Sequence, residues 1–221
     1  MTDLLRSHPF FSEKQIDSCT ILEHQGYCNE NYLVTAEGVK YIVRKLLRDE
    51  IDRDFEWKVH RLAFEQGITA EPLAFDKENG VMVFEFLEGE HKTKLELDEL
   101  KLLAQTLHKL HSITIDAKPI ALQTDTGTID KYPKEYVLCH NDLNPQNIFF
   151  WEEVKFIDWE YAGVNDRYFD LASVCVEFGL KSKMQEQFLG AYFEGAYNLE
   201  KLEAYKIIYK NLCETWFQKN L

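Results

Sequence analysis

The chain has 221 residues and a formal net charge of −13 at neutral pH. A hydrophobic content of 45% supports a sizeable core, so we expect a globular protein with one large domain or two small lobes. Nucleic acids and anionic membranes are bound through an excess of Lys and Arg, which this chain lacks. The charge therefore argues against both partners, whereas a cationic small substrate is compatible with it.

The sequence also gives an expectation for the cellular location of the protein. No stretch approaches the roughly 18 apolar residues of a membrane span, and the first residues lack the basic-then-apolar order of a signal peptide. We therefore expect a cytoplasmic protein without membrane insertion. The five cysteines include no Cys-x-x-Cys pair, so neither a disulfide framework nor a zinc site is indicated.

The chain changes character near residue 88. Before it, the pattern alternates between strands and turns around one helix, and after it the pattern is mainly helical. Strands are predicted at 20–23, 31–35, 40–45, 73–76 and 81–86, with a helix at 49–66. Further helices are predicted at 95–112, 170–178, 184–197 and 199–219. We therefore divide the chain into an N-terminal nucleotide-clamping lobe, 1–87, and a helical C-terminal lobe, 88–221, with the catalytic loop and the acceptor site.

The most informative segment is Cys-His-Asn-Asp-Leu-Asn-Pro-Gln-Asn at 139–147, followed by Asp158 after an apolar hairpin. Phosphoryl transfer from ATP needs a carboxylate that takes the proton of the acceptor hydroxyl, and oxygen ligands for Mg²⁺. Asp142 fits the first role, and Asn147 with Asp158 fits the second. The spacing predicts an ATP-dependent kinase. Together with the strand-rich first part and the helical second part, it leads us to expect an α+β, two-lobed, protein-kinase-like fold.

Residues of the N-terminal lobe are candidates for binding ATP. Gly26 lies in a strand-turn-strand context where backbone amides can cover phosphates, and Asn29 follows it. Arg44 and Lys45 lie on opposite faces of one predicted strand, so only one of them can reach the phosphates. We choose Arg44 and expect Glu56 on the following helix to pair with it.

Three histidines require separate interpretation. His108 and His111 lie on a predicted helix among leucines, where packing or capping is favoured over catalysis. For His140 we expect a bracing hydrogen bond, with Asp170 as its partner, rather than proton transfer.

The acceptor is predicted to be a small molecule. A protein kinase needs a long activation segment that ends in Ala-Pro-Glu, whereas here Asp170-Leu171-Ala172 follows Asp158 after twelve residues. Glu177 lies in an otherwise apolar run and needs a cation, either a substrate or a structural partner such as Arg167. Tyr209 and Trp216 recur at helical spacing, where core packing competes with a cation-binding role.

Over residues 20–180 the chain resembles the choline/ethanolamine kinase group of the aminoglycoside-phosphotransferase-like kinases. The resemblance rests on the motif residues above and on the segments 29–32, 41–44, 51–56, 83–89 and 157–162. It implies that the backbone at Glu85 and Leu87 holds adenine, that Asp142 is the base, and that Asn147 and Asp158 bind Mg²⁺. It also implies that choline's ammonium group lies among aromatic rings and a carboxylate of the helical lobe.

We therefore predict a kinase that uses ATP and Mg²⁺ to convert choline into phosphocholine. The candidate acceptor residues are Asp142, Glu177, Tyr209 and Trp216. The alternatives are a kinase of ethanolamine, thiamine or an aminoglycoside, and a catalytically silent nucleotide-binding protein. The intact set of Asp142, Asn147 and Asp158 argues against the silent protein.

Overall fold

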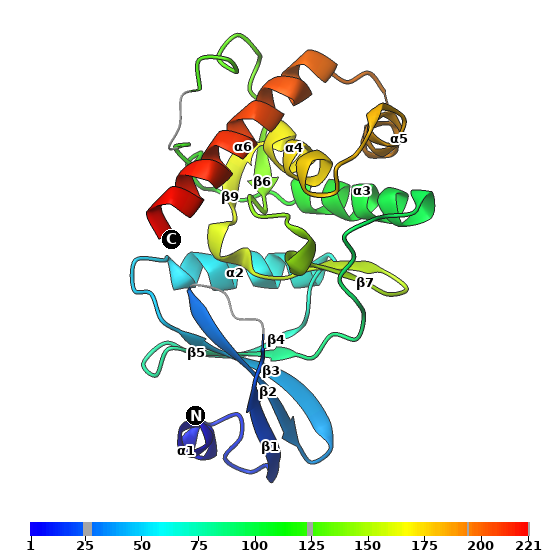
Figure 1. Cartoon of the computed structure of the whole chain (residues 1–221). Helices are drawn as coiled ribbons and strands as arrows, with labels where there is room; N and C mark the ends of the chain where they lie inside the picture. Colours follow the sequence, from blue (N-terminus) through cyan, green and yellow to red (C-terminus); the bar gives the residue numbers. More distant parts are fainter. Residues whose placement is uncertain (24–27, 123–125, 194, 221) are drawn as a thin grey trace. The chain divides into compact units, whose positions relative to one another are not determined.

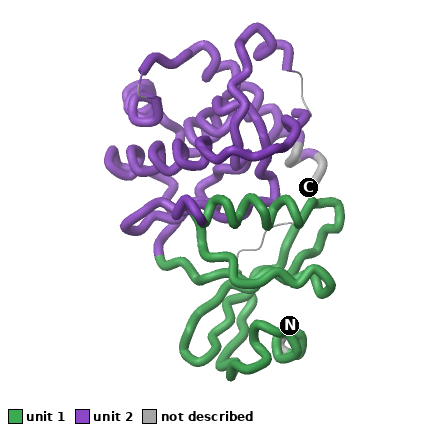
Figure 2. Tube along the Cα trace, turned by 180° about the vertical axis from the view of Figure 1, so that it is seen from behind, with its two compact units in different colours: residues 1–64, 69–88 green, residues 65–68, 89–221 purple. Residues whose placement is uncertain are grey.

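The computed structural model describes residues 1–23, 28–122, 126–193 and 195–220. The chain forms two compact units (Figure 2). Unit 1 comprises residues 1–64 and 69–88, and unit 2 comprises residues 65–68 and 89–221. The first contains an antiparallel sheet and the second is mainly helical, which confirms the predicted α+β class.

Unit 1 is built on a five-stranded antiparallel sheet with the order β1-β2-β3-β5-β4 (Figure 1). The strands are β1 (Ile16–Ile21), β2 (Asn29–Ala36), β3 (Val39–Leu46), β4 (Pro72–Asp76) and β5 (Val81–Glu85). Alternation along β3 and β5 gives the sheet two apolar faces. Val43 and Val83 pack with Leu5 and Phe11 on one face, and Met82 and Phe84 pack on the other with Trp57 of helix α2 (Arg53–Glu65).

The elements of unit 1 differ from the predicted ones by more than two residues in three places. Helix α1 (Thr2–Ser7) was not predicted, and β1 begins at Ile16 rather than at residue 20. Helix α2 begins at Arg53 rather than at residue 49, because the Asp52 carboxylate accepts the backbone N–H of Phe55 at 3.0 Å and caps the first turn.

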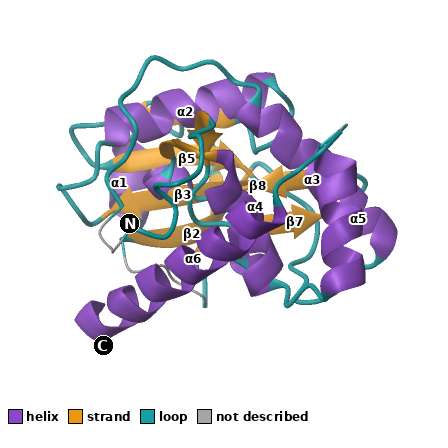
Figure 3. Ribbon diagram, turned by 90° about the horizontal axis from the view of Figure 1, so that it is seen from above, coloured by secondary structure: helices purple, strands orange, loops and turns teal. Residues whose placement is uncertain are grey.

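Unit 2 contains four α-helices in its described residues, together with two short sheets. The helices are α3 (Leu97–His111), α4 (Arg167–Glu177), α5 (Ser182–Tyr192) and α6 (Leu199–Asn220). Helices α4 and α6 pack side by side (Figure 1), and α3 packs against α5 (Figure 3). In the part of the chain that the structure describes, no helix is both long and apolar enough to cross a membrane.

The two small sheets of unit 2 frame the catalytic loop. The predicted hairpin is present as β7 (Ile148–Phe150) and β8 (Val154–Phe156). A second pair, β6 (Tyr136–Cys139) with β9 (Gly163–Asp166), was not predicted. Helix α4 begins at Arg167 rather than at residue 170, because the Asp166 side chain accepts the N–H of Tyr168 and caps it. Helix α5 ends at Tyr192 rather than at residue 197.

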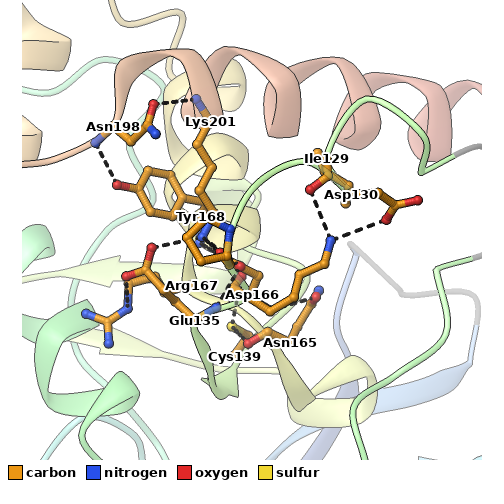
Figure 4. A network of polar contacts seen from close by, with 12 residues as sticks. Ile129, Asp130, Glu135, Cys139, Asn165, Asp166, Arg167, Tyr168, Asn198 and Lys201 are labelled. Carbon is orange, nitrogen blue, oxygen red and sulfur yellow. Dashed lines mark hydrogen bonds and ion pairs between the residues drawn. The ribbon is translucent and has the colours of Figure 1, made fainter.

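A buried lysine joins α6 to the start of α4 (Figure 4). The side chain of Lys201 is 1% exposed, and its ammonium group lies 2.8 Å from carboxylate oxygens of both Asp166 and Glu135. It also donates to the Pro133 carbonyl at 2.8 Å and lies 4.5 Å from the centre of the Tyr168 ring. Two carboxylates and a carbonyl therefore compensate the charge of the Lys201 ammonium group. A buried ion pair is tolerated under this condition.

Replacement of Lys201 by Met should destabilise the protein strongly, because it leaves the carboxylate of Asp166 buried without its cation. Breaking a buried pair in this way costs about 3 to 5 kcal/mol. Urea unfolding measures the loss, and Lys210→Met at an exposed position of the same helix is the control. A loss for Lys201→Met no larger than that of the control would contradict the role of the pair.

Candidate active site

The predicted catalytic loop, residues 140–147, is held by one carboxylate. Asp170, on α4, is fully buried and accepts the backbone N–H of His140 at 2.7 Å and the backbone N–H of Asn141 at 2.8 Å. The imidazole Nε2 of His111 lies 3.1 Å from the same carboxylate. Three partners thus compensate a charge that would be costly to bury alone. Asp170 fixes the chain direction where β6 ends and the loop begins.

Asn141 has a left-handed backbone with φ of 66°. This conformation disfavours most L-residues by roughly 1 to 2 kcal/mol, and asparagine tolerates it because its side chain bonds locally. Here the amide nitrogen donates to the Tyr161 carbonyl at 3.0 Å, and the amide oxygen accepts from Asn165 at 2.9 Å. The chain therefore turns at the residue that precedes Asp142.

The Asp142 carboxylate is held by two amide groups. Asn144 Nδ2 donates to one oxygen at 3.1 Å, and Asn147 Nδ2 donates to the other at 2.8 Å. Burial raises the pKa of Asp142 above its usual range, and the nearby charge of Asp158 acts in the same direction. The result is an oriented carboxylate with increased proton affinity, which is the requirement for a general base.

Asn147 and Asp158 are the predicted Mg²⁺ ligands. The Ile157 N–H donates to the Asn147 carbonyl at 3.0 Å, which brings the two ends of the β7–β8 hairpin together. The side-chain N–H of Asn147 donates to the Asp142 carboxylate, so the amide oxygen of Asn147 is directed away from that carboxylate. Asp158 has a left-handed backbone with φ of 67° and lies close enough to Asp142 to affect its pKa. An amide oxygen and a carboxylate suit Mg²⁺, so these residues fit the predicted metal.

Glu177 and Tyr209 meet in unit 2, where helices α4 and α6 pack. The Tyr209 hydroxyl donates to Glu177 Oε1 at 2.8 Å. Burial raises the pKa of Glu177, and the charge of Asp142 raises it further, so the two carboxylates are electrostatic neighbours. The structural partner considered from the sequence, Arg167, instead pairs with Glu135 at 3.5 Å. The side chain of Trp216 lies outside the described residues.

In unit 1, Arg44 and Glu56 form the expected pair. Arg44 Nη1 donates to Glu56 Oε1 at 3.0 Å, and both side chains are buried. The neighbouring Lys45 is half exposed on the other face of β3, as the strand register predicts. Arg44 also donates to the Asn31 side chain at 3.2 Å, which fixes the guanidinium beside the first turn of α2.

Arg53 belongs to the same network but was not predicted from the sequence. Its guanidinium donates to Glu56 Oε2 at 2.6 Å and, through Nη2, to the Cys28 carbonyl and the Asn29 amide oxygen. Arg53 therefore ties α2 to the start of β2 and holds Asn29, one of the predicted phosphate-site residues. A first-turn arginine usually extends into solvent, and only the i, i+3 spacing to Glu56 offered a signal.

His111 and His140 form hydrogen bonds, but the predicted partner of the His140 side chain is wrong. The His140 side chain donates to the Ile157 carbonyl at 2.9 Å rather than to Asp170, which binds the His140 backbone instead. The histidine that reaches Asp170 with its side chain is His111. His108 is exposed on α3, with its ring at the edge of Tyr192.

Comparisons with known proteins show what the chain is similar to. Residues 121–205 match the phosphotransferase enzyme family. Protein LicA of Haemophilus influenzae is 26% identical over 231 residues, 87% of this chain and 86% of that protein. The family resemblance is confirmed. Over residues 121–205 the chain is similar to phosphotransferase enzymes, and over most of its length it is similar to protein LicA.

Two solved structures share the fold. The choline kinase LicA from Streptococcus pneumoniae has a TM-score of 0.79 at 22% identity and covers 98% of this chain and 89% of its own. A choline/ethanolamine kinase family protein from Mesorhizobium loti has a TM-score of 0.73 at 20% identity, with coverages of 96% and 80%. These likenesses confirm the predicted kinase-like fold.

The adenine-binding residues that the family resemblance implies lie at the end of unit 1. Glu85 is the last residue of β5, where its N–H donates to the Glu71 carbonyl and its carboxylate accepts the Glu71 N–H. Leu87 is half-buried, two residues beyond the strand. Gly26, the predicted phosphate-loop glycine, lies outside the described residues. The nucleotide-binding roles of these residues stay predictions.

Glu56→Gln tests the network that orients Arg44. The change removes the charge of the carboxylate that two buried guanidinium groups share, so we expect a loss of about 3 to 5 kcal/mol of stability. Chemical denaturation measures it, with Glu65→Gln as an exposed control on the same helix. Equal stabilities for the two variants would show that Glu56 does not hold the arginines.

Proposed function

We propose that the protein transfers the γ-phosphate of ATP to the hydroxyl of choline, giving phosphocholine and ADP. The observation that carries the proposal is the Asp142 carboxylate, oriented by Asn144 and Asn147 and next to a second carboxylate, Asp158. Such an arrangement suits phosphoryl transfer to an alcohol, where positioning and charge stabilisation supply most of the rate enhancement.

In the proposed reaction Asp142 accepts the proton of the choline hydroxyl. The alkoxide oxygen forms a bond to the γ-phosphorus, and the bond between that phosphorus and the bridging oxygen breaks, so that ADP leaves. The raised pKa of Asp142 favours proton uptake as the O–P bond forms. Asn144 and Asn147 keep the carboxylate oriented, because each occupies one of its oxygens.

Asn147 and Asp158 would hold Mg²⁺ in this reaction. The ion, when bound, neutralises charge on the transferring phosphoryl group. Asp142 binds the amide N–H of Asn147, so the amide oxygen of Asn147 would be available to the cation. The same contact couples the ligand to the base, so both are oriented together.

For the nucleotide, we propose that unit 1 supplies Arg44 to the phosphates, with Glu56 as the residue that orients it. Asn29 and Gly26 would lie at the phosphates as well, and the backbone of Glu85 and Leu87 would bind adenine. The Arg44–Glu56 ion pair supports the first role, since a kinase requires this pairing of strand cation and helix carboxylate.

For the acceptor, we propose that Glu177 and Tyr209 face the ammonium group of choline, with Trp216 as a further ring. The support is a carboxylate held by a phenol and electrostatically coupled to the base Asp142. Aromatic faces attract a quaternary ammonium by about 0.5 to 2 kcal/mol each. Ethanolamine is the second candidate, because its primary ammonium can hydrogen-bond to Glu177 directly.

A coupled ADP-release assay over choline, ethanolamine, thiamine and an aminoglycoside tests the proposal. We expect choline to give the highest kcat/KM. Asp142→Asn should lose turnover by a factor on the order of 100 or more while ATP still binds, because the carboxylate acts on the acceptor hydroxyl. Near-wild-type kcat for Asp142→Asn would overturn its role as the base, and ATP binding without turnover of any acceptor would favour a silent protein.

Glu177→Gln separates substrate binding from nucleotide binding. Loss of the negative charge should raise KM for choline several-fold while KM for ATP stays constant, because unit 1 supplies the proposed ATP ligands. Glu186→Gln, at an exposed position of α5, is the control and should change neither constant. Equal increases in both KM values would remove Glu177 from the acceptor site.

A further inference from the structure

His111 makes two buried hydrogen bonds to which the proposed reaction assigns no role. It is the last residue of α3, and its side chain is 2% exposed. Nε2 lies 3.1 Å from Asp170 Oδ2, and Nδ1 lies 2.7 Å from the Tyr192 hydroxyl. The ring thus connects α5 to the carboxylate that holds the catalytic loop.

The partners define the tautomer of the ring. The Asp170 carboxylate only accepts, so Nε2 carries the proton and donates it to Asp170. In a neutral ring Nδ1 then accepts, and the Tyr192 hydroxyl donates to it. Burial lowers the pKa of His111, which favours this neutral form. The hydrogen bonds therefore run in one direction, from Tyr192 through His111 to Asp170.

The same residues do not form a metal site of the usual kind. His111, Asp170 and Cys139 bring their ligand atoms within 4.8 Å of one another. Both imidazole nitrogens and both Asp170 oxygens, however, already take part in hydrogen bonds. Burial raises the pKa of the Cys139 thiol well above its usual range, whereas a metal needs the thiolate. The cluster is therefore a hydrogen-bond network.

We propose that His111 is a positioning residue for phosphoryl transfer: by orienting Asp170, it fixes the backbone of His140 and Asn141 and thereby the position of Asp142. The proposal rests on the function proposed above. Each Asp170 oxygen accepts one loop N–H, so rotation of the carboxylate would disturb both bonds at once. His111 is the side chain that opposes this rotation, and Tyr192 keeps its ring in place.

The left-handed backbone of Asn141 makes the loop sensitive to this support. A strained conformation persists only while the surrounding contacts enforce it. Without a correctly oriented Asp170, relaxation of Asn141 would move the Asp142 carboxylate away from the acceptor. A displacement of about 1 Å can reduce the rate roughly 100-fold.

Two matched variants test the proposal. In His111→Gln the amide nitrogen reaches about as far from the backbone as imidazole Nε2, so it can still donate to Asp170. In His111→Asn the amide ends near the position of Nδ1 and cannot. We expect kcat to fall on the order of 10- to 100-fold in His111→Asn and only a few-fold in His111→Gln. KM for ATP should stay within about two-fold in both, because unit 1 is unchanged.

Amide hydrogen exchange at His140 and Asn141 gives a readout that does not depend on the acceptor. Both amides should exchange faster in His111→Asn than in wild type, and His111→Gln should restore their protection. His108→Asn, an exposed histidine on the same helix, serves as the control.

The two readouts separate the possible failures. Unchanged amide exchange in His111→Asn would overturn the positioning role. The role would also be overturned if His111→Asn and His111→Gln lost kcat equally and these losses followed the decrease in melting temperature. If exchange responds as expected but no acceptor is phosphorylated by the wild type, the proposed function fails while the contact with the loop stands.

Discussion

The arrangement of the candidate site depends on the buried carboxylate of Asp170. It accepts two consecutive backbone N–H groups, those of His140 and Asn141, at the point where β6 gives way to the catalytic loop. A carboxylate without partners would be costly to bury, so the loop and the helix that carries Asp170 stabilise each other. The left-handed turn at Asn141, the direction of Asp142 and the start of the hairpin all follow from this constraint.

A second buried carboxylate organises unit 1 in the same way. Glu56 lies between the guanidinium groups of Arg44 and Arg53, and it links the α2 helix to two strands of the sheet. Each unit thus builds its polar centre around an acidic group whose charge is compensated by fixed donors. In both cases we expect removal of one partner to lower the free energy of unfolding by more than the intact pair contributes to it, because the remaining charge stays buried.

The sequence predicts the parts of the site that depend on local spacing. The catalytic loop and the β7–β8 hairpin follow from residues 139–158 alone, because a short loop and a tight turn leave few alternatives. The pairing of Arg44 with Glu56 followed from strand register and the kinase-like pattern. The fold class followed from the change from alternating to helical periodicity.

The sequence does not predict contacts between distant segments. Strands β6 and β9 have four residues each and pair across more than twenty intervening residues, so neither shows a periodic signal of its own. Arg53 and Lys201 have the pattern of exposed helical charges, and only tertiary contacts make them buried partners of carboxylates. The same reason explains why Arg167 was considered for Glu177, although it pairs with Glu135.

The most direct test of the central constraint is a single-turnover measurement of phosphoryl transfer in Asp170→Asn with ATP and choline. At a temperature where wild type and variant are both folded, the loss of one accepting oxygen should slow the chemical step on the order of 100-fold. The affinity for ATP, measured by nucleotide titration, should be unchanged. A wild-type rate of transfer in Asp170→Asn, or an equal loss of ATP affinity, would contradict the account.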